Sequence, residues 1–436
     1  ARPSGDVGAA SVLSTKGDVM APPLPRLRPE LDIMPSPLPD QPGLLLRDPF
    51  RYSDAVLVIP PVLARCLGCF DGAQTEADLH AELSRLTGEI SVREPARHLV
   101  KALREAAFLD DEVFSARRAS RHDAFAAASE RTPAQAGSGY PAEAALLATT
   151  LDGYLERAPP RDARGANVEA LLGVAAPHVS PEGGVASYAA AYRGLPADLG
   201  ERTFVILGTS HYGEPDRFGL TRKPFATPFG ATAPDARLVN ELARAAGDAA
   251  HVEDYCHAVE HSIEFQVVFL QHLYGPNVKI VPILCGAFVD GPATRRPPES
   301  SDAVARFIDA LGNVAAREGE RLFFVLGVDM THIGRRYGDD VAARAGKGEL
   351  VEVETLDRER IARLEAGDAA GFWDLVREGG TPAQGYDALK WCGSSPFYTF
   401  HRALPHARGT LLHYEQWNID DASVVSFGAL AFRDGE

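Results

Sequence analysis

The sequence predicts an α/β protein in which helices flank a layered, mostly parallel sheet, preceded by a small winged-helix-like α+β module. Two observations carry this prediction. From about residue 135 onward, short apolar runs alternate with longer amphipathic stretches, which is typical of parallel strands joined by helices. Before that point the alternation is missing, and the chain opens with a proline-rich stretch. A chain of 436 residues has room for one large and one small domain.

Residues 1–47 combine little hydrophobic periodicity with many prolines. Such a segment cannot bury enough apolar surface to offset the entropy that it loses on ordering. We therefore expect an extended or disordered strap, in which the prolines favour the polyproline II conformation.

Residues 48–118 have the pattern of a small winged-helix-like module. An apolar run over 55–59 predicts a strand. Thr75 and Asp78 are spaced as a helix capping box, and a second helix is expected from Pro95. Two helices with short strands are compatible with a docking module as well as with a functional one.

Residues 119–134 read as a linker, and residues 135–436 as the α/β domain. The expected strands are 171–176, 204–207, 278–284, 322–328, 410–413 and 424–432. The expected helices are 146–155, 184–192, 235–246, 263–273, 302–317, 358–366 and 395–404. The last strand is long, which predicts an antiparallel edge strand or a hairpin partner.

The composition excludes some classes of partner. With 60 acidic against 44 basic residues the net charge is -16, and no basic stripe occurs, so nucleic acid and anionic membrane surfaces are not expected as main partners. Five scattered cysteines do not resemble a disulfide framework, which favours a reducing compartment. No apolar run is long enough for a membrane span, so we expect a cytoplasmic protein.

Three histidines directly follow runs that predict buried parallel strands. These are His178, His211 and His332, and Asp329 lies three positions before the last of them. Because the carboxyl ends of parallel strands meet at one edge of a sheet, we expect these side chains to lie close together.

Two further segments carry donors of the same kind. The segment 260–264 places His261 next to Glu260, and Cys392 precedes the helix expected at 395–404. Imidazole and thiolate together favour a soft or borderline metal ion. The sequence therefore indicates one polar site, built from distant segments, that can hold such a metal.

These segments occur in the order expected of the Memo-like family, also called AmmeMemoRadiSam system protein B. The chain resembles this family over residues 135 to 434. The motifs that carry the resemblance are Gln135-Ala136-Gly137-Ser138-Gly139-Tyr140-Pro141, Ala175-Ala176-Pro177-His178, Ile206-Leu207-Gly208-Thr209-Ser210-His211, Glu260-His261-Ser262-Ile263-Glu264, Asp329-Met330-Thr331-His332-Ile333-Gly334, Cys392-Gly393 and 424–432.

The resemblance implies a fold similar to that of class III extradiol dioxygenases, which hold non-haem iron through two histidines and a carboxylate. In Memo-like proteins a cysteine takes the third position. The metal ligands that this implies are His178, His211 and Cys392. The family is associated with iron or copper binding and with oxidative chemistry.

The resemblance further implies that Asp329, His332 and His261 line the same pocket and serve catalysis. The chain departs from the family pattern at 179–182, where Val-Ser-Pro-Glu stands in place of a small residue, a glycine and an aromatic residue. This departure alters the wall beside the metal. We therefore do not infer the substrate class of this chain from the family.

The residues themselves support such chemistry. Two imidazoles and a thiolate leave open positions on the metal, and a thiolate favours Cu(I), Zn(II) or iron over Mg(II). Asp329 is placed to orient a ligand imidazole, and His332 or His261 to carry a proton. The resulting hypothesis is an iron- or copper-dependent redox enzyme, oxygenase-like, acting on a small molecule or a peptide.

Two other functions stay open. The same pocket can serve a non-catalytic protein that binds a partner or delivers a metal, with residues 1–118 as a surface for a protein partner. A zinc hydrolase is less favoured: His257 and His261, with Glu260 as base, match an inverted zincin pattern, but the segment looks like a loop that enters a helix at Ser262.

Overall fold

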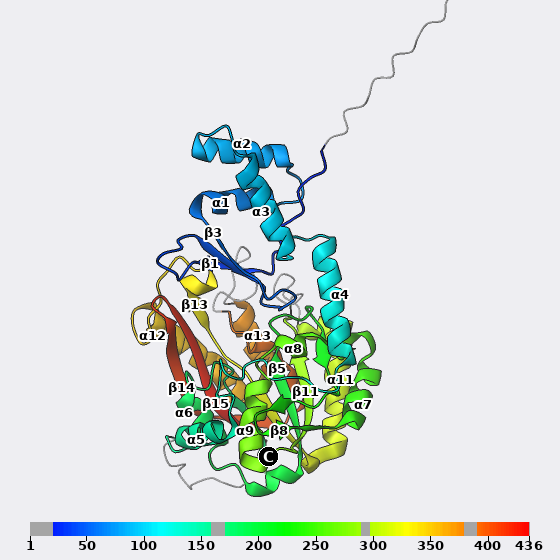
Figure 1. The fold of residues 1–436 in the computed structure, drawn as a ribbon. Coiled ribbons are helices and arrows are strands. Elements are labelled where there is room, and N and C mark those ends of the chain that lie inside the picture. The colour runs from blue at the N-terminus through cyan, green and yellow to red at the C-terminus, as the bar shows by residue number, and fades with distance from the viewer. Residues whose placement is uncertain (1–20, 158–170, 289–296, 379–389, 436) are drawn as a thin grey trace, which may run out of the picture. The chain divides into compact units, whose positions relative to one another are not determined.

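The computed structural model describes residues 21–157, 171–288, 297–378 and 390–435 (Figure 1). The chain divides between Ala119 and Ser120 into two compact units, and each unit has its own hydrophobic core. Among the described helices, none has both the length and the hydropathy of a membrane span.

The first unit is built on a three-stranded antiparallel sheet in the order β1-β2-β3. Leu46 of this sheet belongs to the same buried core as Leu79, Leu99 and Leu103. The elements are β1 (Asp32–Pro35), β2 (Leu44–Arg47), β3 (Val56–Ile59), α1 (Pro61–Arg65), α2 (Glu76–Thr87), α3 (Arg93–Glu105) and α4 (Glu112–Ala127), the last of which runs past residue 119. The winged-helix-like interpretation of this unit stays a prediction.

Helix α2 begins and ends where the sequence signals place it. The hydroxyl of Thr75 accepts a hydrogen bond from the backbone amide of Asp78, whose carboxylate accepts one from the amide of Thr75. Gly88 ends the helix with a φ of 73°, which glycine adopts at little steric cost. An N-cap of this kind contributes about 1 kcal/mol to helix stability.

The domain boundary expected at residue 47 differs from the structure. Strands β1 and β2 lie inside the predicted strap, and β2 pairs with β1 on one side and β3 on the other. Residues 32–47 therefore belong to the sheet of the first unit, where Leu46 is fully buried. Strands of four residues show too little alternation to be recognised in a proline-rich sequence. Residues 1–20 of the predicted strap lie outside the described residues.

The linker expected at 119–134 also differs. Helix α4 covers its first half, up to Ala127. Its second half contains Arg131, which is buried and belongs to the network around the candidate site described below.

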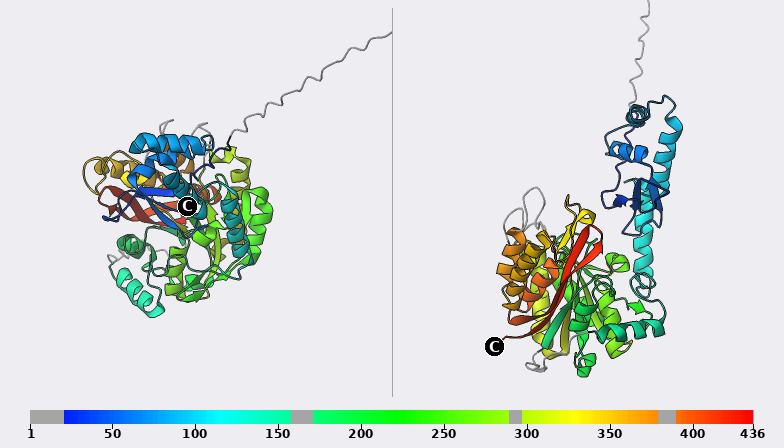
Figure 2. Two further views of the ribbon diagram at one scale, coloured as in Figure 1. Left: turned by 45° about the horizontal axis from the view of Figure 1, so that its top comes forward. Right: turned by 90° about the vertical axis from the view of Figure 1, so that its left-hand side faces the viewer.

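The second unit contains a ten-stranded mixed sheet (Figures 1 and 2). Its order is β10-β6-β11-β5-β12-β4-β15-β13, with β14 paired to β15 and β9 to β11. The strands are β4 (Leu171–Ala176), β5 (Thr203–Thr209), β6 (Phe218–Leu220), β9 (Ala233–Pro234), β10 (Ala250–Val252), β11 (Lys279–Cys285), β12 (Leu322–Gly327), β13 (His332–Gly334), β14 (Ala407–Asp420) and β15 (Ser423–Asp434); β7 (Ala226–Thr227) and β8 (Gly230–Ala231) form a separate pair.

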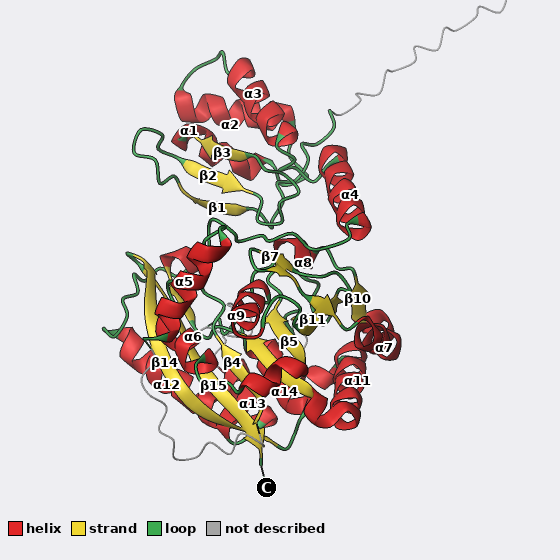
Figure 3. Cartoon of the chain, turned by 60° about the horizontal axis from the view of Figure 1, so that its bottom comes forward, coloured by secondary structure: helices red, strands yellow, loops and turns green. Residues whose placement is uncertain are grey.

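Helices cover both faces of this sheet (Figure 3). Val205 and Leu207 of β5 join one core, whereas Phe204 and Ile206 join the other, because successive side chains of a strand point to opposite faces. The helices are α5 (Ala144–Leu155), α6 (Val185–Tyr192), α7 (Ala236–Ala246), α8 (Cys256–Val259), α9 (Glu264–Tyr274), α11 (Asp302–Glu318), α12 (Glu349–Glu365), α13 (Ala369–Glu378) and α14 (Ser394–Ala403). The predicted α/β class is confirmed.

Four strands of the sheet, β4, β12, β5 and β11, run parallel side by side. Their carboxyl ends therefore lie at one edge, which is where ligands bind in open α/β sheets. The long run predicted at 424–432 forms β15, the antiparallel hairpin partner of β14. β15 also pairs with β4 and β13, so it lies inside the sheet and is not an edge strand.

The core of the second unit contains a histidine without polar partners. His401 of α14 is buried against Phe400 and Phe432, and neither of its ring nitrogens has a hydrogen-bond partner among the described residues. Burial, helped by Arg408, lowers the pKa of His401 from 6.5 to about 4. The fold therefore favours the neutral ring, and it loses stability as the pH falls from 6.5 towards 4 because only the unfolded chain takes up the proton.

We expect His401→Phe to stabilise the fold. At neutral pH the change removes two unpaired buried nitrogens, for a gain of about 1–3 kcal/mol. Below pH 6.5 the gain grows by up to about 1.4 kcal/mol for each pH unit. Urea unfolding at several pH values measures both effects, with His251→Phe at an exposed position as control. If the free energy of unfolding of His401→Phe fell with acidification as steeply as that of the parent protein, His401 would not be a buried ring that the fold keeps neutral.

Candidate metal centre

His178 lies at the carboxyl edge of the sheet, two residues beyond the end of β4. Its ring is buried, and Nδ1 donates a hydrogen bond to the carbonyl of Gly327, 2.9 Å away. The backbone amide of His178 donates to Oδ1 of Asp329 at 2.8 Å. Gly327 ends the neighbouring strand β12 and Asp329 follows it, so the pairing of β4 with β12 fixes the ring and points its Nε2 toward Cys392 and Asp329.

His211 and His261 share one carboxylate. His211 follows β5, and His261 lies between α8 and α9. Nδ1 of His211 lies 3.1 Å from both carboxylate oxygens of Glu260, and Nδ1 of His261 lies 3.0 Å from one of them. Since a carboxylate accepts hydrogen bonds, each Nδ1 carries a proton, and in the neutral rings Nε2 is the nitrogen with the lone pair.

The three imidazole rings lie around one point. Their ring centroids are 5.0 Å apart for His178 and His211, 5.3 Å for His178 and His261, and 5.2 Å for His211 and His261. Their ligand nitrogens lie within 4.8 Å of one another. Because each Nδ1 is held by an oxygen acceptor, Nε2 is the nitrogen that each ring can offer to a metal ion, and Nε2 of His178 contacts Cys392. We call these three residues the histidine cluster; it can hold a metal ion.

The carboxylate of Glu260 holds two rings of the histidine cluster, those of His211 and His261. Its buried carboxylate also accepts hydrogen bonds from the backbone amides of His211, His261 and Ser262. Burial alone would raise the pKa of Glu260, but His211 and His261 outweigh it and hold that pKa well below its ordinary value. Burial lowers the pKa of His211, but Glu260 outweighs it and raises that pKa above 6.5. Such an outer carboxylate orients ligand imidazoles in metal sites.

The ring nearest the sheet is held in the neutral form. Burial puts the pKa of His178 well below its ordinary value, and the neighbouring rings of His211 and His261 lower it further. A neutral imidazole is the form that binds a metal, because its lone pair is then available. The donor set therefore fits a metal ion.

Cys392 contacts the histidine cluster. It lies just before α14, and its Sγ is 3.4 Å from Nε2 of His178. The backbone around it is tied to two strand ends, because its carbonyl accepts from the hydroxyl of Thr209 and the amide of Gly393 donates to the carbonyl of Asp329. Burial, with Asp329 adding to it, raises the pKa of the Cys392 thiol well above 9.0.

Asp329 and His332 complete the neighbourhood of His178. Oδ2 of Asp329 is 3.4 Å from Nε2 of His178, and Nδ1 of His332 donates to the carbonyl of Met330 at 3.0 Å. Burial raises the pKa of Asp329 and lowers the pKa of His332 to about 4. The structure therefore groups His178, His211 and His261 as possible ligands, with Cys392 and Asp329 in contact with His178 and with His332 three residues after Asp329.

Sequence reasoning missed two residues of this neighbourhood and placed a third differently. It gave His261 a lining position, whereas the structure groups it with His178 and His211. It did not assign Glu260 as the acceptor shared by two rings, although the adjacency of Glu260 and His261 was a usable signal. Tyr337, whose ring centroid is 5.0 Å from that of His332, carried no signal, because its position depends on a 3₁₀ turn after β13.

The inverted zincin pattern is not formed. Helix α8 ends at Val259, and Glu260 is extended with a ψ of 144°, so His257 and His261 do not share a helical face. Nε2 of His257 lies 3.0 Å from the carbonyl of Gly219, and the ring is buried. His257 is thus a structural residue, and the zinc-hydrolase alternative loses its pair of ligands.

A buried network supports the segment that carries Glu260 and His261. The carboxylate of Glu264 accepts hydrogen bonds from the backbone amides of Ala134 and Gln135 and from the hydroxyl of Tyr140. Arg131 forms an ion pair with Glu264 and donates to the carbonyls of His257 and Glu260 at 2.8 Å each. The loop between α8 and α9 is therefore held in place by the segment around residues 131–140.

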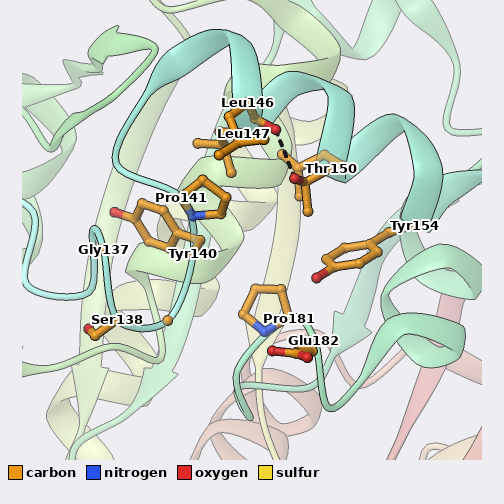
Figure 4. Close-up of a pocket in the computed structure, with 12 residues that line it drawn as sticks. Gly137, Ser138, Tyr140, Pro141, Leu146, Leu147, Thr150, Tyr154, Pro181 and Glu182 are labelled. Atoms are coloured by element: carbon orange, nitrogen blue, oxygen red, sulfur yellow. Dashed lines mark hydrogen bonds between the residues drawn. The ribbon is translucent and has the colours of Figure 1, made fainter.

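A separate pocket of about 430 Å³ opens beside α5 (Figure 4). Phe265 connects its wall to the histidine cluster, because the Phe265 ring lies 6.2 Å from Tyr140 and 5.6 Å from His261. The lining residues are Gly137, Ser138, Gly139, Tyr140, Pro141, Leu146, Leu147, Thr150, Leu151, Tyr154, Pro181 and Glu182. The pocket thus adjoins the site through one aromatic ring.

Comparison with known proteins matches this part of the chain to one protein family. The family model described as Memo-like protein matches residues 131–431. The chain is 26% identical over 296 residues to a MEMO1 family protein of Aquifex aeolicus, covering 68% of this chain and 73% of the relative. It is 28% identical to MEMO1 family protein TK1477 of Thermococcus kodakarensis, covering 70% and 99%. It is also 28% identical to MEMO1 family protein MK0963 of Methanopyrus kandleri, covering 70% and 100%. With more than two thirds of its length matched, and with the matched part carrying the histidine cluster, the chain belongs to the Memo-like protein family.

Proposed function

We propose that this protein is a metal-dependent redox enzyme, oxygenase-like, that uses a non-haem iron or copper ion on a small molecule or a peptide. One observation carries the proposal: three imidazoles converge with their Nδ1 atoms held by oxygen acceptors, and Nε2 of His178 meets the sulfur of Cys392. Three rings whose ligand nitrogens lie within 4.8 Å of one another can hold a single cation.

The ligands in this proposal are His178, His211 and Cys392, with His261 in reach of the same ion. Two ligand atoms on one tetrahedral zinc ion, with bonds of about 2.0 Å to nitrogen and 2.3 Å to sulfur, are roughly 3.5 Å apart. The 3.4 Å between Nε2 of His178 and Sγ of Cys392 agrees with that spacing. A thiolate among imidazoles selects copper, zinc or iron over magnesium and calcium.

An iron or copper ion held here would supply electron transfer at positions open to substrate. The residues around the metal release and accept the protons. The Cys392 thiol must lose its proton to bind the metal, and its raised pKa means that binding releases that proton and becomes stronger as the pH rises. Asp329 and His332 are placed to accept protons beside the cluster, and Asp329 also holds the backbone of His178.

Metal analysis of anaerobically purified protein tests the proposal. We expect about one iron or copper ion per chain, as one site implies, and a loss of most of it in His211→Ala and in Cys392→Ala. His251→Ala, an exposed histidine of β10, is the matched control and should keep the metal. His261→Ala distinguishes two roles: loss of metal makes it a ligand, whereas retained metal with lost redox turnover makes it a pocket residue.

Two results would contradict the proposal. Folded protein that binds neither iron nor copper would remove the metal centre. Bound metal that cannot be cycled between oxidation states by a chemical reductant and air would instead favour a protein that binds a partner or delivers a metal.

A further inference from the structure

A further buried carboxylate, besides those of Glu260, Glu264 and Asp329, is that of Asp357. Asp357 belongs to α12, and its side chain is fully buried. Its Oδ1 accepts hydrogen bonds from the hydroxyl of Thr331 and from the indole N–H of Trp391, each at 2.6 Å. Its Oδ2 accepts from the hydroxyls of Tyr414 and Ser426, at 2.8 and 2.5 Å. A carboxylate has about four acceptor positions, and here four donors use them.

Two of these donors border the proposed metal site. Thr331 lies between Asp329 and His332 in the chain, and Trp391 directly precedes Cys392. The oxygen Oδ1 of Asp357 therefore joins two segments that are far apart in sequence and that both deliver side chains to the site.

The other two donors anchor the carboxylate to the β14–β15 hairpin. Ser426 of β15 not only donates to Asp357 but also accepts, through Oγ, from the backbone amide of Thr331 at 2.9 Å. The backbones of the two segments are also joined, because the amide of Met330 donates to the carbonyl of Ser426 and the amide of Ser426 donates to the carbonyl of Thr331. The hairpin is thus hydrogen-bonded both to Asp357 and to the segment that contains Thr331.

We propose that Asp357 is a positioning residue that sets Cys392 and the Asp329–His332 segment relative to each other. This inference rests on the proposed metal centre. Metal and catalytic sites need their side chains held within about 0.5 Å, and they obtain this from supporting hydrogen bonds. Asp357 has no hydrogen bond to a proposed ligand; it acts through Thr331 and Trp391. Removing it leaves an indole N–H and three hydroxyls without their acceptor, which frees both segments to shift.

A purely structural role for Asp357 predicts a different outcome, and matched variants separate the two. Asp357→Leu removes the acceptor at similar size. Asp357→Asn keeps one carbonyl oxygen for Thr331 and Trp391, while its amide donates to Tyr414 and Ser426, whose hydroxyls can turn. Ile361→Ala is the control, because it destabilises the buried face of the same helix without touching the network.

The experiment titrates each metal-free protein with cobalt(II), which reports a sulfur ligand through its thiolate charge-transfer absorption. We expect Asp357→Leu to bind cobalt about 10- to 100-fold more weakly, the usual effect of losing a supporting carboxylate, and to lose the thiolate band. Asp357→Asn should recover most of the affinity, and Ile361→Ala should bind as the parent does. If Asp357→Leu bound cobalt as tightly as the parent protein and kept the thiolate absorption band, the inference would be overturned.

A second measurement needs no metal. Cys392 is the one half-buried cysteine among the five, all of which lie in the described part of the chain, and its alkylation by iodoacetamide can be followed separately in its own peptide by mass spectrometry. Its alkylation should become several-fold faster in Asp357→Leu and in Trp391→Phe, which removes a single N–H donor and folds more readily. Unchanged alkylation in both variants would overturn the inference. A parent protein that binds no cobalt, but shows these rate changes, would refute the metal centre and leave the positioning role intact.

Discussion

Glu260→Gln is expected to weaken metal binding by up to about 100-fold, the upper range for the loss of an outer carboxylate. Glu260 accepts the Nδ1 protons of His211 and His261, and it donates none. A glutamine presents one oxygen and one NH2 group. The ring that faces the NH2 group must accept there, so it moves its proton to Nε2, and that nitrogen can no longer bind a metal.

The same change is expected to destabilise the fold by about 2–4 kcal/mol, because charge-assisted hydrogen bonds are lost and a donor is left opposite other donors. The pKa of Glu260 lies well below 4.5, so the stability that the carboxylate contributes is present above pH 4.5 and disappears as the pH falls towards its folded-state pKa. Glu260→Gln should therefore flatten the acid limb of the stability curve.

Calorimetric titration with zinc and urea unfolding at several pH values measure these effects. Glu253→Gln is the matched control, because Glu253 pairs with Thr221 and Arg222 and has no contact with the histidine cluster among its hydrogen bonds. If Glu260→Gln bound zinc as tightly as the control does, the shared carboxylate would not be setting the tautomers of the two rings.

Arg131→Met is expected to destabilise the second unit by about 3–5 kcal/mol, the cost of leaving a buried charge without its partner. Arg131 and Glu264 have side chains with no solvent exposure. Arg131 also donates to the carbonyls of His257 and Glu260, so the loop that carries Glu260 loses these two hydrogen bonds at the same time. Metal affinity should fall together with stability.

Urea unfolding of Arg131→Met and of the double variant with Glu264→Gln measures this cost. The double variant removes the unpaired charge, and it should recover part of the lost stability but not the loop support, so its metal affinity should stay low. Arg237→Met is the control, because the Arg237 side chain is exposed and Glu318 keeps Arg317 and Arg321 as partners, so we expect a loss of about 0–1 kcal/mol. If Arg131→Met lost no more stability than Arg237→Met, the buried ion pair of Arg131 with Glu264 would not stabilise the second unit as proposed.

The sequence predicted the elements that are long and buried. The run 171–176 coincides with β4, and the runs 204–207, 278–284 and 322–328 fall on β5, β11 and β12, because strands covered on both faces are nearly continuous apolar runs. Strands β6, β9, β10 and β13 have two or three residues each and gave no signal. Helix α12 begins at Glu349 instead of 358, since acidic residues interrupt the apolar pattern of its first turns.

For the site, the position of a polar residue after a buried strand was enough to select His178, His211 and His332. Parallel strands end at one edge, so this expectation follows from chain direction alone. The same reasoning could not place Glu260 or Asp357. Each is one of 60 acidic residues, and a charged residue in a helix or a loop is exposed more often than not.

By itself, then, the sequence determined the α/β class, the family motifs and the kinds of donor atom in the site. Only the tertiary structure decided that His261 joins His178 and His211, that Glu260 serves two rings at once, and that Asp357 binds Thr331 and Trp391, the neighbours of His332 and Cys392. The reason is physical: hydrophobic periodicity records which face of an element is buried, whereas the partner of a buried polar group is set by contacts between segments that are distant in the chain, 151 residues apart for His178 and Asp329.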